Sequence, residues 1–174
     1  QSLKAAIAQE PVLILPDPKR PFVIHVDASG FATGAVLQQD QGSGLQPIAY
    51  LSKKMLDAET RYPIHEQELL AIIVALKAWR HYLMGARFTI TIMSDHKSLT
   101  QFKTQPLLSG RQARWKDILA NYDLDIVYVE GKANVVADGL SRRPDHHRDS
   151  SNATTTTTTA GDRELLIQAI ELFT

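Results

Sequence analysis

Four acidic residues occupy positions where a folded core has no use for a charge. Asp27 ends the apolar run FVIHVD, and Asp95 ends the apolar run FTITIMSD. Glu68 and Asp138 lie among apolar residues, in HEQELLAIIVALKAW and NVVADGLS. Carboxylates suit Mg²⁺, which proteins usually hold through a few such groups together with a substrate phosphate. Two ions at ~3.5–4 Å can assist an in-line displacement at phosphorus, so these acids predict metal-dependent phosphoryl chemistry.

The composition restricts the ligands that a metal could find. The chain has 174 residues, of which 44% are apolar, which suits one core with tails. It has no cysteine, so disulfides and thiolate metal sites are excluded. No apolar run is long enough for a membrane span, and the first residues do not resemble a signal peptide, so we expect an intracellular protein.

The net charge does not indicate a nucleic-acid partner, because 19 basic residues balance 19 acidic ones. The distribution is more informative. Between Lys97 and Lys116 the charged residues are all basic, which predicts either a local phosphate-facing surface or an ordinary solvated face.

The elements that would position the four acids follow an α/β order. Alternating and β-branched runs predict strands, and apolar residues at three- and four-residue steps predict helices. The expected strands are FVIHVDAS, ATGAVLQQ, QPIAYLS, RFTITIMSD and DLDIVYVE, and the expected helices span about 62–83, 98–102, 110–122 and 134–140. The order βββαβααβα predicts a five-stranded mixed sheet flanked by helices, with the first and fourth strands parallel.

That sheet would bring the acids together. Asp27 and Asp95 would leave parallel strands at the same carboxyl edge, where α/β folds place their sites. Glu68 shares a helix face with Ile72 and Trp79, which turns it toward the sheet. Glu66 competes with Glu68 for this role, but the two lie about 160° apart on a helix and cannot face the same metals.

The two ends of the chain differ from its middle. Residues 1–20 contain Pro11, Pro16 and Pro18, and Pro21 follows directly, which predicts a connector after a short helix near residues 3–8. The expected strands and helices lie within residues 21–144, which we therefore expect to form the folded domain. Residues 145–161 are polar and include six consecutive threonines, which predicts a disordered linker, and residues 162–174 have helical spacing.

The region from Pro11 to Pro144 resembles the RNase H domain of Ty3/gypsy-type reverse transcriptases. The matching blocks, in order, are PVLILPDPKRPFVIHVDAS with TGAVLQQ, IAYLSKKM, RYPIHEQELLAIIVALKAWRHYL, SDHKSL and RQARWKDILANYDLDIVYVEGKANVVADGLSR. The resemblance implies an RNase H-like fold and a catalytic metal site formed by Asp27, Glu68, Asp95 and Asp138, with the second acid directly before the LLA block. It also implies two Mg²⁺ ions, which Mn²⁺ could replace, and hydrolysis of the RNA strand of RNA–DNA hybrids.

The same resemblance suggests partners and substrate contacts. We expect a polymerase domain upstream, an integrase downstream, and a location in a cytoplasmic virus-like particle or the nucleus. The candidate substrate-binding residues near the acids or in the basic stretch are Ser29, Gly30, His96, Ser98, Arg111 and Arg114, and Gly34 could also let a substrate backbone pass. Trp79 and Trp115 are expected in the core. His25 and His65 are expected to be structural.

Two other functions remain open from sequence. A catalytically inactive RNase H-fold domain, acting as a connection or nucleic-acid-binding module, should have lost an acid, yet all four are present. An integrase-type transferase would carry its glutamate after both aspartates, whereas Glu68 lies between Asp27 and Asp95. The loop EGKANVV before the last helix lacks the histidine that retroviral and cellular relatives often carry, which leaves the turnover rate open.

Overall fold

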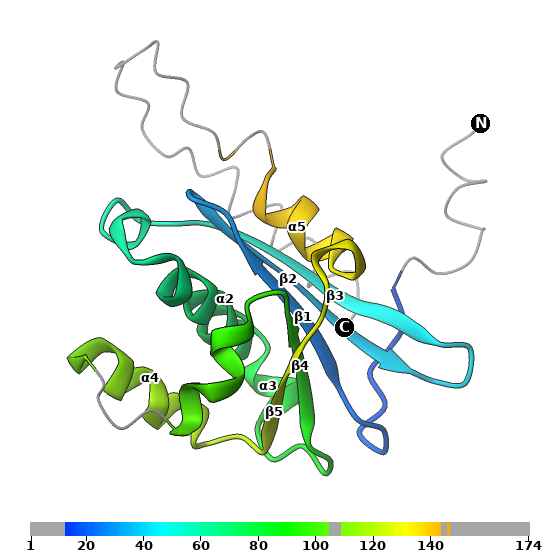
Figure 1. The fold of residues 1–174 in the computed structure, drawn as a ribbon. Helices are drawn as coiled ribbons and strands as arrows, with labels where there is room; N and C mark the ends of the chain where they lie inside the picture. Colours follow the sequence, from blue (N-terminus) through cyan, green and yellow to red (C-terminus); the bar gives the residue numbers. More distant parts are fainter. Residues whose placement is uncertain (1–12, 105–108, 144–145, 147–174) are drawn as a thin grey trace, which may run out of the picture.

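A five-stranded mixed sheet with strand order β3-β2-β1-β4-β5 lies at the centre of the computed structural model (Figure 1), which describes residues 13–104, 109–143 and 146. The strands are β1 (Val23–Ala28), β2 (Ala32–Asp40), β3 (Leu45–Lys54), β4 (Ile90–Ser94) and β5 (Leu124–Tyr128). β1, β2 and β3 form an antiparallel meander, whereas β4 pairs in parallel with β1 and with β5. The predicted α/β fold and its mixed sheet are confirmed.

The helices follow the predicted order with one break. They are α2 (Ile64–Ala78), α3 (Arg80–Leu83), α4 (Gly110–Leu119) and α5 (Val135–Ser141), with 3₁₀ turns η1 (Glu59–Arg61), η2 (Lys97–Thr104) and η3 (Gly131–Ala133). The helix expected over 62–83 is split at Trp79, whose backbone leaves the helical region. Trp79 and Trp115 are both buried in the core, as predicted.

Alternate residues of β1 face the two sides of the sheet. Ile24 and Val26 are fully buried in the core cluster, which includes the apolar residues of α2. His25 and Asp27 instead contact the segment that contains α5, through Asn134 and Ser141. Figure 1 shows α2 and α4 on one side of the sheet and α5 on the other. β1 is therefore the strand that links the core to α5.

Gly34 of β2 allows α5 to approach the sheet closely. A Cβ atom at this position would lie 2.3 Å from the Ala137 carbonyl oxygen and 2.5 Å from the Ser141 nitrogen. Any side chain would thus push the helix away. The expectation that Gly34 leaves room for a substrate backbone was wrong, because the backbone of α5 occupies that space.

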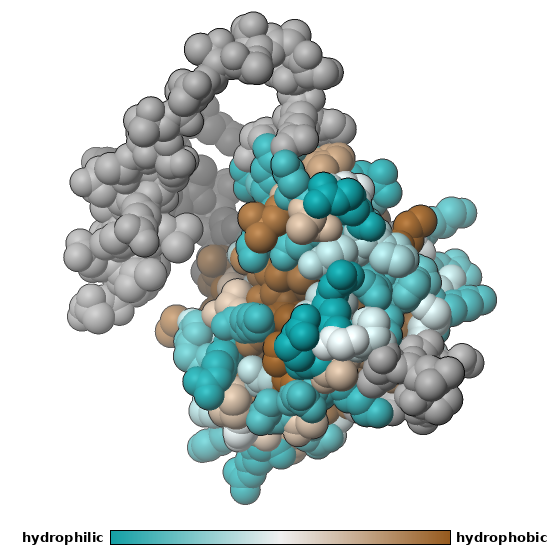
Figure 2. Space-filling model, turned by 90° about the vertical axis from the view of Figure 1, so that its left-hand side faces the viewer, coloured by the Kyte–Doolittle hydropathy of each residue, from teal (hydrophilic) through white to brown (hydrophobic). Residues whose placement is uncertain are grey.

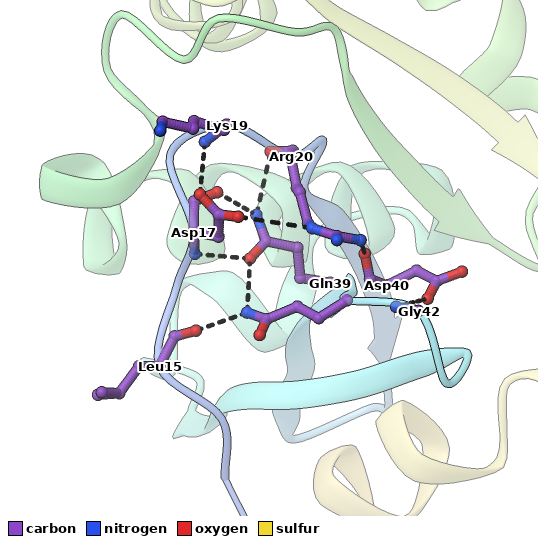
Figure 3. A network of polar contacts seen from close by, with 8 residues as sticks. Leu15, Asp17, Lys19, Arg20, Gln39, Asp40 and Gly42 are labelled. Carbon is purple, nitrogen blue, oxygen red and sulfur yellow. Dashed lines mark hydrogen bonds and ion pairs between the residues drawn. The ribbon is translucent and has the colours of Figure 1, made fainter.

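The segment before β1 is hydrogen-bonded to the far end of the sheet (Figure 3). The side-chain amide of Gln39 donates to the carbonyls of Asp17 (2.8 Å) and Arg20 (3.0 Å), and its oxygen accepts from the Asp17 nitrogen (2.8 Å). The backbone nitrogen of Ile14 donates to Pro47 of β3. The later part of the predicted connector is therefore built onto β2 and β3.

The surface is mainly polar on the face shown in Figure 2, where hydrophilic residues surround a narrow strip of hydrophobic ones. Within the described ranges, no helix is long and apolar enough to cross a membrane. The short helix expected near residues 3–8 and the segment 162–174 lie outside the described residues, as does the predicted linker apart from His146.

Candidate metal centre

Three of the four predicted acids meet at the carboxyl edge of the sheet. Asp27 lies near the end of β1, Asp95 directly follows β4, and Glu68 lies in the second turn of α2. Each offers a carboxylate oxygen, and these oxygens lie within 4.8 Å of one another. The parallel pairing of β1 with β4 places the two strand ends side by side. Strand order predicted that Asp27 lies beside Asp95, and helical period predicted that Glu68 faces the sheet; the structure brings these three residues together, and they are called the acid cluster below.

Glu68 is the most perturbed member of the acid cluster. It is 5% exposed, and its Oε2 atom is buried without a hydrogen-bond partner among the described residues. Burial, reinforced by the charges of Asp27 and Asp95, raises the pKa of Glu68 to about 8. A buried carboxylate oxygen without a donor is costly unless a cation or a proton compensates it.

Asp27 is also buried, whereas Asp95 is exposed. Burial raises the pKa of Asp27, and a hydrogen bond from the Ser141 hydroxyl opposes that rise. Two buried acids and one exposed acid around an unpaired oxygen are a hard-oxygen donor set that fits a divalent cation. The exposed acid leaves the cluster open to solvent on one side.

Asp138 does not join the acid cluster. It lies on α5, and its carboxylate is paired with Arg142 one turn later on the same helix. Its side chain is 44% exposed. The charge of Asp138 still raises the pKa of Asp27, so it lies within electrostatic range of the cluster.

Glu66 points away from the acid cluster. Its carboxylate accepts hydrogen bonds from Arg111 and from Gln112, the latter at 3.1 Å, both on α4. Arg111 also lies over the ring of Tyr62, 3.5 Å from its centroid. The preference for Glu68 over Glu66 agrees with this geometry, in which the buried carboxylate of Glu66 is paired with Arg111.

The predicted substrate-binding residues fall into two groups. His96 and Ser98 lie beside Asp95 and contact each other at 2.8 Å, with Ser98 exposed. Gly30 is exposed, and no described atom lies within 4 Å of where its Cβ would be. These three are available to a ligand.

The other predicted contacts have different surroundings. Ser29 is buried, and its hydroxyl donates to the carbonyl of Ser141 at 2.6 Å. Arg111 is engaged by Glu66 and Tyr62, as described above. Arg114 is exposed and lines an open cleft with Lys53 and Lys77, between α4, β3 and α2. The acid cluster itself does not line this cleft.

Sequence reasoning missed the residues that hold the last helix beside the acids. Asn134 is buried; its amide nitrogen donates to the Val26 carbonyl at 2.8 Å, and its oxygen lies 3.3 Å from His25 Nδ1. A Cβ on Gly131 would lie 3.3 Å from Asp95 Oδ2, so the η3 loop approaches the cluster. A polar residue just before a helix was the available signal for Asn134.

The fold and the acid cluster together define an RNase H-like protein. The family model described as the RNase H-like domain found in reverse transcriptase matches residues 17–122. The chain belongs to this family.

Its relatives include pol polyproteins of Ty3/gypsy-type retrotransposons, as the sequence resemblance predicted. The chain is 40% identical over 153 residues to the retrovirus-related Pol polyprotein from transposon 297 of Drosophila melanogaster, covering 86% of this chain and 14% of that protein. It is 36% identical over 146 residues to the Tf2-3 transposon polyprotein of Schizosaccharomyces pombe, covering 82% and 11%. The chain thus corresponds to a small part of these relatives.

Solved structures support the fold. The foamy viral protease-reverse transcriptase in complex with an RNA/DNA hybrid has a TM-score of 0.54 and 20% identity, covering 83% of this chain and 19% of that one. LC11-RNase H1 in complex with an RNA/DNA hybrid has a TM-score of 0.55 and 15% identity, covering 68% and 92%. At these identities the likeness concerns the fold alone.

Proposed function

We propose that this domain is an endonuclease that hydrolyses the RNA strand of RNA–DNA hybrids with Mg²⁺. The observation that carries the proposal is the buried, unpaired Oε2 of Glu68 within the acid cluster of an RNase H-like domain. Neither apolar packing nor a surface ion pair explains a buried carboxylate in that cluster, and a divalent cation would compensate its charge.

Asp27, Glu68 and Asp95 would hold the metal, with Mn²⁺ as a substitute for Mg²⁺. Two bound divalent ions would activate a water and stabilise the leaving oxygen at phosphorus. The chain's own part is to gather the carboxylates: without a cation they repel one another, and with a cation all three are ionised. The hybrid would be recognised by its shape and by the 2′-hydroxyls of its RNA strand.

Asp138 would complete the ligand set when the hybrid binds. Its pair with Arg142 is largely exposed, and such pairs contribute little to stability. The carboxylate is therefore free to exchange Arg142 for a cation at small cost. Arg142, once released, would be available to a phosphate of the hybrid.

The remaining predicted contacts would surround the scissile bond. Gly30, His96 and Ser98 would meet the nucleic-acid backbone beside the cluster. Ser29 would act through the backbone of the first hairpin rather than through its hydroxyl, because that hydroxyl already donates to the carbonyl of Ser141. Arg111 and Arg114 would contribute positive charge on the α4 side.

The relatives suggest a biological setting for the proposed activity. Because those relatives are Pol polyproteins, we place this domain in a reverse transcriptase, with a polymerase upstream and an integrase downstream. Degradation of the RNA strand would then accompany DNA synthesis in a cytoplasmic virus-like particle or the nucleus.

Cleavage of a labelled RNA–DNA hybrid by the purified chain with Mg²⁺ tests the proposal. Single-stranded RNA, double-stranded RNA and an Asp95→Asn variant serve as controls. Internal cuts confined to the RNA strand of the hybrid, and absent in the variant, are expected. A folded chain that binds the hybrid without cutting it would instead favour the catalytically inactive connection domain.

A further inference from the structure

Ser141 at the end of α5 is the only described residue whose side-chain hydroxyl donates to a member of the acid cluster. Its Oγ lies 2.5 Å from Asp27 Oδ2. Ser141 is 0% exposed, so it can contact neither substrate nor solvent. This hydroxyl therefore acts on Asp27 alone among the acids.

The alternative acceptor of this hydroxyl is already satisfied. Ser141 Oγ also lies 2.9 Å from the Asp138 carbonyl, as expected for a serine one turn later in a helix. That carbonyl accepts the backbone N–H of Arg142 at 3.1 Å. A hydroxyl has one hydrogen, and a carboxylate is the stronger acceptor. The hydrogen of Ser141 is thus directed to Asp27.

The place of α5 does not depend on this bond. Asn134 fixes the start of the helix to the Val26 carbonyl. Near its end, Ser29 donates to the Ser141 carbonyl and Ser52 donates to the Leu140 carbonyl, each at 2.6 Å. Those contacts involve main-chain acceptors, so they persist when the Ser141 side chain is removed.

We infer that Ser141 is a positioning residue for the metal centre: its hydroxyl fixes the orientation of the Asp27 carboxylate so that the other carboxylate oxygen is directed at the cation. The inference rests on the proposed function, because it concerns the same acid cluster. Groups that orient a metal ligand in this way typically change metal affinity or activity by about 10–100-fold when removed.

Ser52→Ala is the matched control for Ser141→Ala. Both changes remove a hydroxyl that contacts a backbone carbonyl of α5, but only the hydroxyl of Ser141 contacts Asp27. Ser141→Cys leaves no cavity and replaces the hydroxyl by a much weaker donor, which provides a second variant if Ser141→Ala does not fold.

Binding of Mn²⁺ to the free protein, followed by the electron paramagnetic resonance signal of unbound Mn²⁺, tests the inference without cleavage. Ser141→Ala, or Ser141→Cys in its place, should raise the dissociation constant about tenfold or more, while Ser52→Ala binds as the wild type does. Unchanged binding in the Ser141 variants, or equal weakening in Ser52→Ala, would overturn the inference.

Cleavage provides a second readout that a purely structural role would not move. The Ser141 variant should lose rate at limiting Mg²⁺ and recover it at high Mg²⁺, with an unchanged KM for the hybrid. A loss that high Mg²⁺ does not reverse would overturn the inference. If the wild type binds Mn²⁺ in the expected pattern but leaves hybrids intact, the proposed nuclease function fails, while the positioning role of Ser141 is supported.

Discussion

The two ends of the central sheet treat buried polar groups in opposite ways. At the end where the chain enters, Gln39 is 0% exposed, yet both its amide nitrogen and its oxygen are hydrogen-bonded to the preceding segment (Figure 3). At the carboxyl edge, Glu68 is 5% exposed, and its Oε2 has no partner among the described residues. Both side chains are buried, but only Gln39 has hydrogen bonds to both of its polar atoms.

This difference distinguishes polar groups that stabilise the fold from polar groups that are available to bind a ligand. A satisfied buried amide stabilises the fold modestly, and an unsatisfied buried group costs about 1–3 kcal/mol. The acid cluster therefore weakens the metal-free protein. Natural proteins tolerate such costs mainly at functional sites. Four sets of substitutions test this contrast.

The largest expected effect is on cleavage. Asp27→Asn, Glu68→Gln and Asp95→Asn should each lower the rate of hybrid cleavage by more than about 100-fold, because a direct metal ligand matters more than a group that orients one. Asp138→Asn should also impair cleavage but leave Mn²⁺ binding to the free protein near the wild-type level, because Asp138 is paired with Arg142. Loss of free-protein Mn²⁺ binding in Asp138→Asn, equal to that in Asp95→Asn, would contradict this arrangement.

A substitution at the opposite end of the sheet should affect stability alone. Gln39→Leu leaves the polar atoms of Asp17 and Arg20 without their partner, and we expect a loss of about 2–4 kcal/mol in the free energy of unfolding. Urea denaturation measures the loss. Gln38→Leu, the same change at the neighbouring and less buried position, is the control and should cost much less. If Gln39→Leu changed the Mg²⁺ dependence of cleavage, the two ends of the sheet would not be independent, which would contradict the contrast between them.

Glu68 should make the metal-free protein less stable as the pH rises. Its pKa is about 8 in the folded chain against 4.5 ordinarily, so the folded state binds the proton more tightly. That contribution is complete below about pH 4.5 and is lost as the pH rises through 8. Glu68→Gln should remove this dependence and stabilise the metal-free chain at pH 8 by roughly 1–3 kcal/mol. Urea denaturation measures the free energy of unfolding against pH. Profiles that run parallel for the wild type and Glu68→Gln would contradict the prediction.

The smallest effect is expected two residues earlier in α2. Glu66→Gln weakens the contacts with Arg111 and Gln112 and should cost about 1 kcal/mol, while cleavage stays near the wild-type rate. Urea denaturation and initial cleavage rates measure the two quantities. A variant pair in which Glu66→Gln loses cleavage and Glu68→Gln keeps it would reverse the assignment of the second acid.

Sequence patterns predicted most of the fold, and they predicted correctly that three of the four acids meet. Strand alternation and a crossover helix place Asp27 beside Asp95, and helical period distinguishes Glu68 from Glu66. The side-chain direction of Asp138 was not accessible in this way, because it depends on competition from Arg142 one turn away.

Contacts between segments distant in sequence were also missed. The bond between Ser141 and Asp27 joins residues 114 positions apart, and no local pattern indicates it. Gly34 was interpreted as a possible substrate contact because the close approach of α5 cannot be read from the first hairpin. The break in the helix at Trp79 was likewise not predicted from the sequence, in which the helical spacing continues through this residue.

Thermal unfolding of the wild type and of Glu68→Gln at pH 8, with Mg²⁺ titrated against NaCl of equal ionic strength, tests most directly whether the acid cluster is a metal site. A ligand that binds only the folded state raises its stability. The melting temperature of the wild type should rise with Mg²⁺, whereas Glu68→Gln should start higher and respond little. No response in the wild type, or an equal rise in both proteins, would contradict a metal site built around the unpaired oxygen of Glu68.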